Sequence, residues 1–195
     1  MFKQVDNEME LALFNFIWMT AWREKGFEFE FSTRVLGRYV VITPQGEYVG
    51  SAEFKPYAPG GGPLEEIAPF AFHPNVAADP SRVAEIDKIA LLKEWRGDYT
   101  SELLSSAVHF AQEYGYHYFV SLLEPVFYRA LRITYRVPME KVGPAKFYKG
   151  DQVVPVVFDM KRMYENPSQY EWLSFREFAM RPPECSALPT LSSLL

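Results

Sequence analysis

The sequence predicts one α/β domain in which helices flank a mixed central β-sheet, and three observations support this prediction. From residue 84 onward the chain alternates in the order strand, helix, strand, helix, as judged by apolar runs and amphipathic stretches. A crossover of this kind places two strands side by side and parallel. Residues 38–54 form two strand-like runs around Pro44-Gln45-Gly46, which predicts an antiparallel hairpin. Hydrophobic residues make up 48% of the 195-residue chain, enough for a full core.

End signals frame the first predicted helix. Asp6 or Asn7 can cap its N-terminus, and Gly26 can supply the left-handed residue that ends it. Its apolar stretch, residues 11–22, is too short to span a bilayer, so we expect a buried helix and no membrane span. The chain shows no cleavage pattern of a secretory signal, and its one cysteine, Cys185, fits a reducing compartment. We therefore expect a cytoplasmic protein.

The remaining elements follow from hydrophobic period and turn residues. Alternating Phe and Glu over residues 27–31 predict a half-buried strand or an extended lead-in to the hairpin. Residues 55–82 are rich in Pro, Gly and Ala without a sustained period, so we expect a long loop. Further on we expect strands over residues 84–92, 118–123 and 153–160, and helices over 100–114, from 125 onward and over 169–180. Residues 1–162 then form the folded domain, and residues 163–195 a C-terminal helix and tail.

Charge and histidine spacing argue against two classes of function. The chain carries 25 acidic and 20 basic residues, a net charge of -5, whereas nucleic-acid-binding domains usually carry a basic excess. His73, His109 and His117 lack metal-ligand spacing with one another or with the cysteine. We therefore expect neither a nucleic-acid partner nor a metal site.

Residues 84–104, AEIDKIALLKEWRGDYTSELL, join a strand to a helix through a basic turn that contains glycine. This segment resembles the central motif of the GNAT acyltransferases, whose backbone amides at the helix N-terminus hold the pyrophosphate of coenzyme A. Arg96 and Gly97 match the Arg-Gly that opens the motif, whereas Tyr99 and Ser101 replace its two later glycines. Helix N-termini attract anions through their orphan amides and their dipole. The resemblance implies the GNAT fold, with acyl-CoA or acetyl-CoA as co-substrate and no permanently bound cofactor.

The same resemblance implies which residues hold the acyl carrier. The implied set is Leu91, Leu92, Arg96, Gly97, Asp98, Tyr99, Thr100 and Ser101. Asp98 adds a negative charge where phosphates would lie, and an ordinary strand-to-helix loop is the alternative. The thioester carbonyl would lie against the backbone amides of residues 89–92. GNAT enzymes often protonate the departing thiolate with a tyrosine on the next helix, and Tyr128 is the candidate here, with Tyr135 as its competitor.

Three features resemble one GNAT branch, the acyl-homoserine-lactone synthases and the related long-chain N-acyltransferases. Residues 85–88, Glu-Ile-Asp-Lys, are similar to the Glu-x-x-Arg of that branch, and Gly143-Pro144 precedes the final apolar strand as it does there. The first helix is aromatic and contains arginine, as in that branch. The resemblance implies an N-acyltransferase that moves an acyl group from acyl-CoA, or from an acyl carrier protein, to an amine of a small molecule.

Charged residues on the strand over residues 84–92 are the catalytic candidates. Burying such charges without partners is costly, so they are paired or functional. In the functional interpretation Glu85 accepts the proton of the amine, while Asp87 and Lys88 hold the substrate. Successive strand residues point to opposite faces, so we expect Glu85 and Asp87 in one pocket and Lys88 opposite. A structural ion pair or an exposed strand end is the alternative.

A basic run near the C-terminal end suggests a partner. Its members are Arg129, Arg132, Arg136, Lys141, Lys146 and Lys149. They form either a solvated face or a landing site for an acidic acyl carrier protein or for coenzyme A phosphates. For the whole chain, the altered glycines of the motif leave a second reading open, a non-catalytic GNAT-fold module that binds an acyl carrier or a protein partner. The oligomeric state also stays open, a homodimer included.

Overall fold

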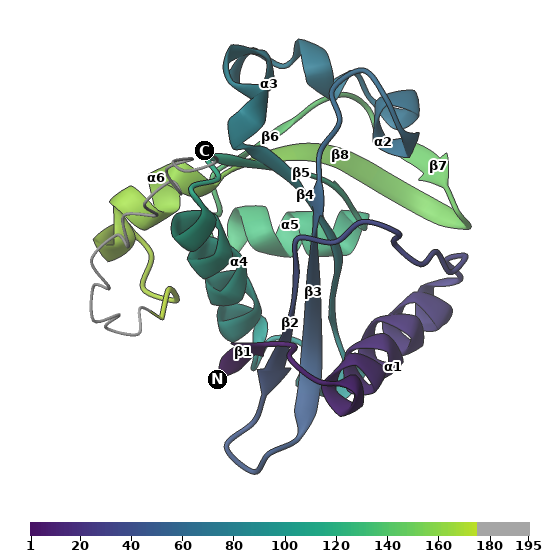
Figure 1. Ribbon diagram of the computed structural model, residues 1–195, viewed down its shortest axis with the longest axis vertical. Coiled ribbons are helices and arrows are strands. Elements are labelled where there is room, and N and C mark those ends of the chain that lie inside the picture. Colours follow the sequence, from purple (N-terminus) through teal and green to yellow (C-terminus); the bar gives the residue numbers. More distant parts are fainter. Residues whose placement is uncertain (175–195) are drawn as a thin grey trace, which may run out of the picture.

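A mixed sheet, confirmed as predicted, organises residues 1–174, the part of the chain that the computed structural model describes (Figure 1). Its strands are β1 (Phe2–Gln4), β2 (Gly37–Ile42), β3 (Tyr48–Pro56), β4 (Val83–Leu91), β5 (Tyr118–Leu123), β6 (Met139–Lys141), β7 (Lys146–Tyr148) and β8 (Asp151–Asp159). They lie in the order β1-β2-β3-β4-β5-β8-β6, and β7 also pairs with β8. β4 and β5 are parallel, and the other pairs recorded for these residues are antiparallel.

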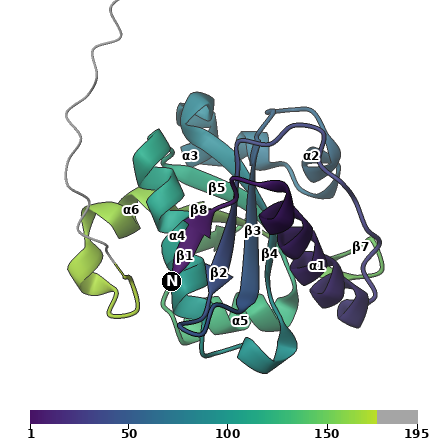
Figure 2. The ribbon, with the colours of Figure 1, turned by 60° about the horizontal axis from the view of Figure 1, so that its bottom comes forward.

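Helices cover both faces of this sheet. They are α1 (Glu8–Lys25), α2 (Pro63–Ile67), α3 (Pro74–Ala78), α4 (Thr100–Tyr114), α5 (Pro125–Ile133) and α6 (Met160–Glu165), with single 3₁₀ turns at Phe70–Phe72, Pro80–Arg82, Lys93–Trp95 and Pro167–Gln169. Figure 2 shows α1 and α4 on opposite sides of β2 and β3. On the α4 side Phe110 stacks on Phe54, with ring centroids 3.9 Å apart. On the α1 side the fully buried Trp18 packs in a cluster with Val40 and Ala90.

The elements with clear end signals form as predicted. Asn7 caps α1 by accepting a hydrogen bond from the Glu10 amide at 2.9 Å, and Gly26 ends that helix with φ 77°. The hairpin over residues 38–54 is β2 and β3, and the predicted strand–helix–strand–helix run is β4, α4, β5 and α5. Among residues 1–174, no helix is both long and apolar enough to cross a bilayer.

Two predicted elements differ from the structure, and one is narrowed by it. Residues 27–31 form no strand, which leaves the alternative of a lead-in to the hairpin, and the rings of Phe29 and Phe31 meet Trp18 edge-on. The expected loop over residues 55–82 contains the short helices α2 and α3, which at five residues each are too short to show a sustained period. Of the helix predicted over residues 169–180, residues 170–174 are not helical, and the rest lies outside the described residues. The domain boundary drawn after residue 162 falls inside α6.

β4 departs from both of its neighbours near its middle. It pairs with β5 only over residues 83–85, so the two parallel strands diverge beyond that point. Its pairing with β3 passes from Glu53–Asp87 to Ser51–Ala90, which leaves one extra residue on β4. Lys88 adopts a left-handed φ of 48° at this bulge. A divergence and a bulge at one place open the sheet and create room for a ligand.

Candidate active site

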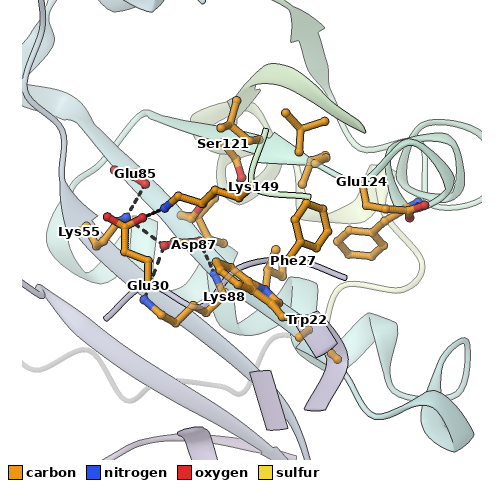
Figure 3. Close-up of a pocket in the computed structure, with 18 of the residues that line it drawn as sticks. Trp22, Phe27, Glu30, Lys55, Glu85, Asp87, Lys88, Ser121, Glu124 and Lys149 are labelled. Carbon is orange, nitrogen blue, oxygen red and sulfur yellow. Dashed lines mark hydrogen bonds and ion pairs between the residues drawn. The ribbon is translucent and has the colours of Figure 1, made fainter. Parts of the chain in front are cut away.

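A pocket of about 840 Å³ opens where β4 and β5 diverge. Its lining comes from the C-terminal end of α1, the ends of β3 and β5, the bulged half of β4, α5, and residues 148–149 of the hairpin between β7 and β8 (Figure 3). A further side is formed by residues 26–36, here called the wall segment, of which Phe27 and residues 30–34 line the pocket. The volume is in the range of sites for small molecules and cofactors.

A lysine with two carboxylates lies in this pocket. Lys55 Nζ is 2.6 Å from Glu85 Oε1 and 2.9 Å from Asp87 Oδ2. Figure 3 shows the three side chains together. Burial raises the pKa of Glu85 above its ordinary value, and the charge of Lys55 opposes this only in part. Burial also acts to raise the pKa of Asp87, but the charges of Lys55 and Lys88 outweigh it and hold that pKa below the ordinary value. When their environments shift the pKa values of two carboxylates in opposite directions, the two groups suit different roles. Glu85, with the raised pKa, is the better proton acceptor.

Lys88 lies on the same face as Asp87, so its predicted place on the opposite face is wrong. Its Nζ is 3.6 Å from Asp87 Oδ2, forms a buried ion pair with Glu53, and donates to Ser32 Oγ at 2.7 Å. The cause is the bulge, because an extra residue with left-handed φ interrupts the alternation of side chains. Lys88 thus ties the wall segment to the sheet, and it shares the carboxylate of Glu53 with Arg38.

Side chains form hydrogen bonds with backbone groups that, because of the bulge and the divergence, have no partner in a neighbouring strand. Ser121 donates its hydroxyl to the carbonyl of Ile86 at 2.9 Å, and Ser51 donates to the carbonyl of Lys88 at 2.9 Å. The Lys88 amide donates to Asp87 Oδ1 at 2.8 Å. Both serines are buried. The opening between β4 and β5 is therefore held in shape by specific hydrogen bonds.

We expect Ser121→Ala to lower the free energy of unfolding by about 1–3 kcal/mol, because it leaves the Ile86 carbonyl buried without a partner. It should also lower the affinity for ligands of the pocket. The matched control is Ser106→Ala, since Ser106 is buried and donates to the carbonyl of Leu103 within α4, away from the pocket lining. Urea denaturation and ligand titration measure the two effects. Equal losses of ligand affinity in both variants would contradict the role given to Ser121.

The turn between β4 and α4, here called the carrier turn, contains the residues expected to hold the acyl carrier and lies at one end of the pocket. Leu91, Arg96, Gly97 and Thr100 line it, whereas the other members of the implied set, Leu92, Asp98, Tyr99 and Ser101, do not. No side chain caps the N-terminus of α4, and Gly97 has a φ of 95°. Arg96 is held by Glu24 of α1, with Nη2 2.6 Å from Oε2. The turn thus brings a glycine, an arginine and an uncapped helix start to the pocket.

The structure separates the two candidate tyrosines. Tyr128 is absent from the pocket lining, and its hydroxyl accepts a hydrogen bond from Arg132 at 3.4 Å. Tyr135 lines the pocket and donates its hydroxyl to the Gly97 carbonyl at 3.3 Å. Of the two candidates, Tyr135 is therefore the tyrosine that lies at the carrier turn.

The basic run does not converge on the pocket. Arg129 and Arg132 are exposed on α5, Arg136 follows that helix, and Lys141 and Lys146 are exposed on β6 and β7. Lys149 is separate, since it lines the pocket and pairs with Glu30. Exposure fits a solvated face and a carrier-protein landing site equally. No cluster of metal-ligating side chains occurs among residues 1–174.

Two chain segments meet across the pocket and were missed by sequence reasoning. Lys149 and Gly150, both with positive φ, form the two-residue turn between β7 and β8. The Lys149 carbonyl accepts the amide of Glu28 at 2.9 Å, and its side chain pairs with Glu30 (Figure 3). Gly150 lies against Gly26 so closely that a Cβ would overlap the Gly26 carbonyl oxygen. The Lys-Gly dipeptide was the one signal of this turn in the sequence.

We expect Gly150→Ala to destabilise the protein by more than about 1 kcal/mol, because a methyl group meets both a positive φ and the Gly26 backbone. Gly46→Ala is the matched control, since Gly46 also has a positive φ but has open space around it. Urea denaturation of both variants measures the difference. If the two lose the same stability, the contact between the hairpin and the wall segment contributes nothing.

Comparison with known proteins defines the fold. No family model and no curated protein sequence matches the chain. Solved structures do match: FeeM, an N-acyl amino acid synthase from uncultured soil microbes, is 13% identical, with 88% of this chain and 92% of that chain covered and a TM-score of 0.64. A putative N-acetyltransferase from Lactobacillus plantarum is 14% identical, with 82% and 97% covered and a TM-score of 0.58.

A third match is BjaI, a CoA-dependent acyl-homoserine lactone synthase, at 13% identity. It covers 80% of this chain and 78% of that chain, with a TM-score of 0.59. The chain therefore has the GNAT fold, as residues 84–104 predicted, and lactone synthases are among the structures that share it.

Proposed function

We propose that this protein is an N-acyltransferase that moves an acyl group from a thioester carrier to an amine of a small molecule. The observation that carries the proposal is the Glu85–Asp87–Lys55 cluster inside a pocket at the β4–β5 divergence. An amine must lose a proton before it attacks a thioester, and Glu85 has the raised pKa that suits a proton acceptor. Acyl transfer is also the activity named for FeeM and BjaI, which share the fold.

The reaction follows from this arrangement in one displacement. Glu85 takes a proton from the ammonium group, and the neutral nitrogen attacks the thioester carbonyl, which lies beside the amides of residues 89–91. These amides stabilise the developing oxyanion. The amide of Leu92, also expected there from the sequence, already donates to the Val49 carbonyl at 3.0 Å. The new carbon–nitrogen bond forms, the carbon–sulfur bond breaks, and the thiolate takes a proton from Tyr135. The amide nitrogen then releases its second proton, which restores the hydroxyl of Tyr135. The products are an amide and a free thiol, and no covalent enzyme intermediate is needed.

The carrier end of the site consists of Arg96, Gly97 and the start of α4, which suit the phosphates of coenzyme A. An acyl carrier protein is the other donor, and the exposed arginines of α5 would receive it. One observation favours the non-catalytic module instead. Arg96 is already paired with Glu24 at 2.6 Å, so a phosphate must compete with a carboxylate for it.

A titration of the purified protein with coenzyme A and with acyl-CoAs of increasing chain length tests the proposal. A ligand that binds only the folded state, at 100 times its Kd, stabilises that state by about 2.7 kcal/mol and raises the melting temperature. Each acyl-CoA that binds is then incubated with a panel of amines, and the amide product is measured by mass spectrometry. Binding without any amide product would support the non-catalytic module. No shift with any acyl-CoA would exclude coenzyme A as the carrier.

A further inference from the structure

The side of α1 that faces away from the sheet is apolar and exposed. A helix that is apolar on nearly all sides is normally buried all round, and the sequence predicts a buried helix here. The structure buries only the side against the sheet, where Phe14 and Trp18 have no exposed surface. On the other side Met9 is 63% exposed and Phe16 is 58% exposed, with the exposed Ala12 between them. Figure 1 shows α1 at the edge of the molecule.

These exposed residues form a continuous strip along the helix. Met9, Ala12 and Phe16 follow the spacing i, i+3, i+7, which places them on one side of a helix. Leu13 and Thr20, both half-buried, border them. The five residues are here called the outer face. Because α1 has 18 residues, it is about 27 Å long, and rows of this spacing are the ones that pack against a second helix.

The two ends of the outer face carry unmatched charges of opposite sign. Glu8 lies in the first turn of α1 and Arg23 in the last turn, and both are exposed. Neither belongs to an ion pair recorded for residues 1–174, although the Arg23 guanidinium lies over the ring of Phe29. The other charged residues of these two turns are paired, namely Glu10 with Lys3, Glu24 with Arg96 and Lys25 with Glu124.

This arrangement is complementary to itself. Phe16 lies at its centre, because Met9 precedes Phe16 by seven residues and Arg23 follows it by seven. A two-fold axis beside Phe16 turns a second α1 antiparallel to the first and places the first turn of each helix next to the last turn of the other. Glu8 of each copy then lies near Arg23 of the other copy, and the two Phe16 rings meet at the axis. One surface thus matches itself in polarity and in charge.

We propose that the outer face is the interface of a homodimer in which the α1 helices of two copies pack antiparallel. A bilayer fits the face less well, because membrane surfaces are anionic and Glu8 borders the face. A stable interface buries about 800 Å² on each partner, more than one helix face offers, so the dimer is reversible. The interface and the pocket use different sides of α1, since the pocket-lining Lys25 lies about two and a half turns after Phe16.

Sedimentation velocity of the full chain tests the inference. No thioester is present, so the outcome is independent of acyl transfer. We expect a monomer–dimer equilibrium with a Kd of about 1–100 μM, in the range of small reversible interfaces. Phe16→Glu places two carboxylates at the axis and should weaken the dimer about 100-fold or more. Ile133→Glu is the matched control, since Ile133 is 67% exposed on α5 and lies outside the pocket lining, and it should leave the Kd unchanged.

A charge exchange tests the antiparallel arrangement itself. Glu8→Arg and Arg23→Glu each place like charges against one another at both ends of the interface. Each should weaken the dimer about 5- to 50-fold at low salt, because symmetry counts every change twice. The double variant restores opposite charges and should recover most of the loss. Urea denaturation of every variant confirms that the fold is kept.

Three results would overturn the inference. They are a chain that stays monomeric at every concentration, a dimer that persists in Phe16→Glu, and a double variant that dimerises no more tightly than the single variants. Vesicle binding by a monomeric chain, lost in Phe16→Glu, would also overturn it and would assign the outer face to a bilayer. Amide formation from acyl-CoA by a chain that stays monomeric would leave the acyltransferase in place and contradict only the dimer.

Discussion

Glu85→Gln is expected to reduce turnover about 100- to 10,000-fold, the usual contribution of a general base. Glutamine keeps the size of the side chain and removes its ability to accept a proton. Substrate affinity should change much less, because Asp87 and Lys55 remain in place at 2.9 Å. Glu94→Gln, at an exposed position outside the pocket lining, serves as the control. Steady-state kinetics with a saturating thioester measures the loss.

The pH dependence gives this prediction a second readout. Burial raises the pKa of Glu85 above its ordinary value of 4.5. The protonated acid cannot accept a proton, so turnover should rise with pH through that raised pKa as Glu85 ionises. The acceptor amine gives a separate rise at higher pH, in the range of its own pKa. A low-pH limb that persists unchanged in Glu85→Gln would rule out Glu85 as the base.

Glu53→Gln is expected to lower the free energy of unfolding by about 3–5 kcal/mol, since it removes the partner of a buried charge. Glu53 is fully buried, pairs with Lys88, and accepts from Arg38 Nε at 2.6 Å. Its loss leaves two cations next to each other without their shared anion. It also weakens the bond that holds Ser32 of the wall segment to the sheet.

Urea denaturation checks this expectation. The control is Glu165→Gln, which breaks an exposed pair with Lys161 at 3.7 Å and should change stability little. A loss for Glu53→Gln no larger than that of the control would show that water or a structural rearrangement compensates the two cations. Glu53→Gln should also release the wall segment before the sheet unfolds, which hydrogen exchange at residues 26–36 would detect.

The parts of the fold that the sequence predicts best are those with local causes. The helix over residues 100–114 has a long apolar face and a terminal Gly115, and the next helix begins at Pro125, as the structure confirms. The turn at Pro44-Gln45-Gly46 defines a hairpin within a few residues. Residues 84–104 carry enough of a motif to indicate the GNAT fold, because strand, turn and helix lie together in one stretch.

The site is less accessible to sequence reasoning, because its partners meet only in the folded chain. The alternation rule placed Lys88 on the wrong face, since it assumes a regular strand and the bulge breaks that regularity. Lys55 and Glu53 could have been noticed as charges on an otherwise apolar strand, the same signal that drew attention to Glu85.

The contact of Gly26 with Gly150 joins an early residue of the chain to a late one. During synthesis the first helix and the wall segment emerge long before the hairpin that completes the pocket, and the intervening residues supply almost the whole sheet. Phe27, Phe29 and Phe31 of the wall segment meet tryptophans of α1, which precede them in the chain, whereas Gly26 and Glu28 gain their contacts with Gly150 and Lys149 only near the end of synthesis. A chain shortened from its C-terminal end past residue 150 would lack the contact of Gly150 with Gly26, so the last part of the chain to be made is the part that closes this side of the pocket.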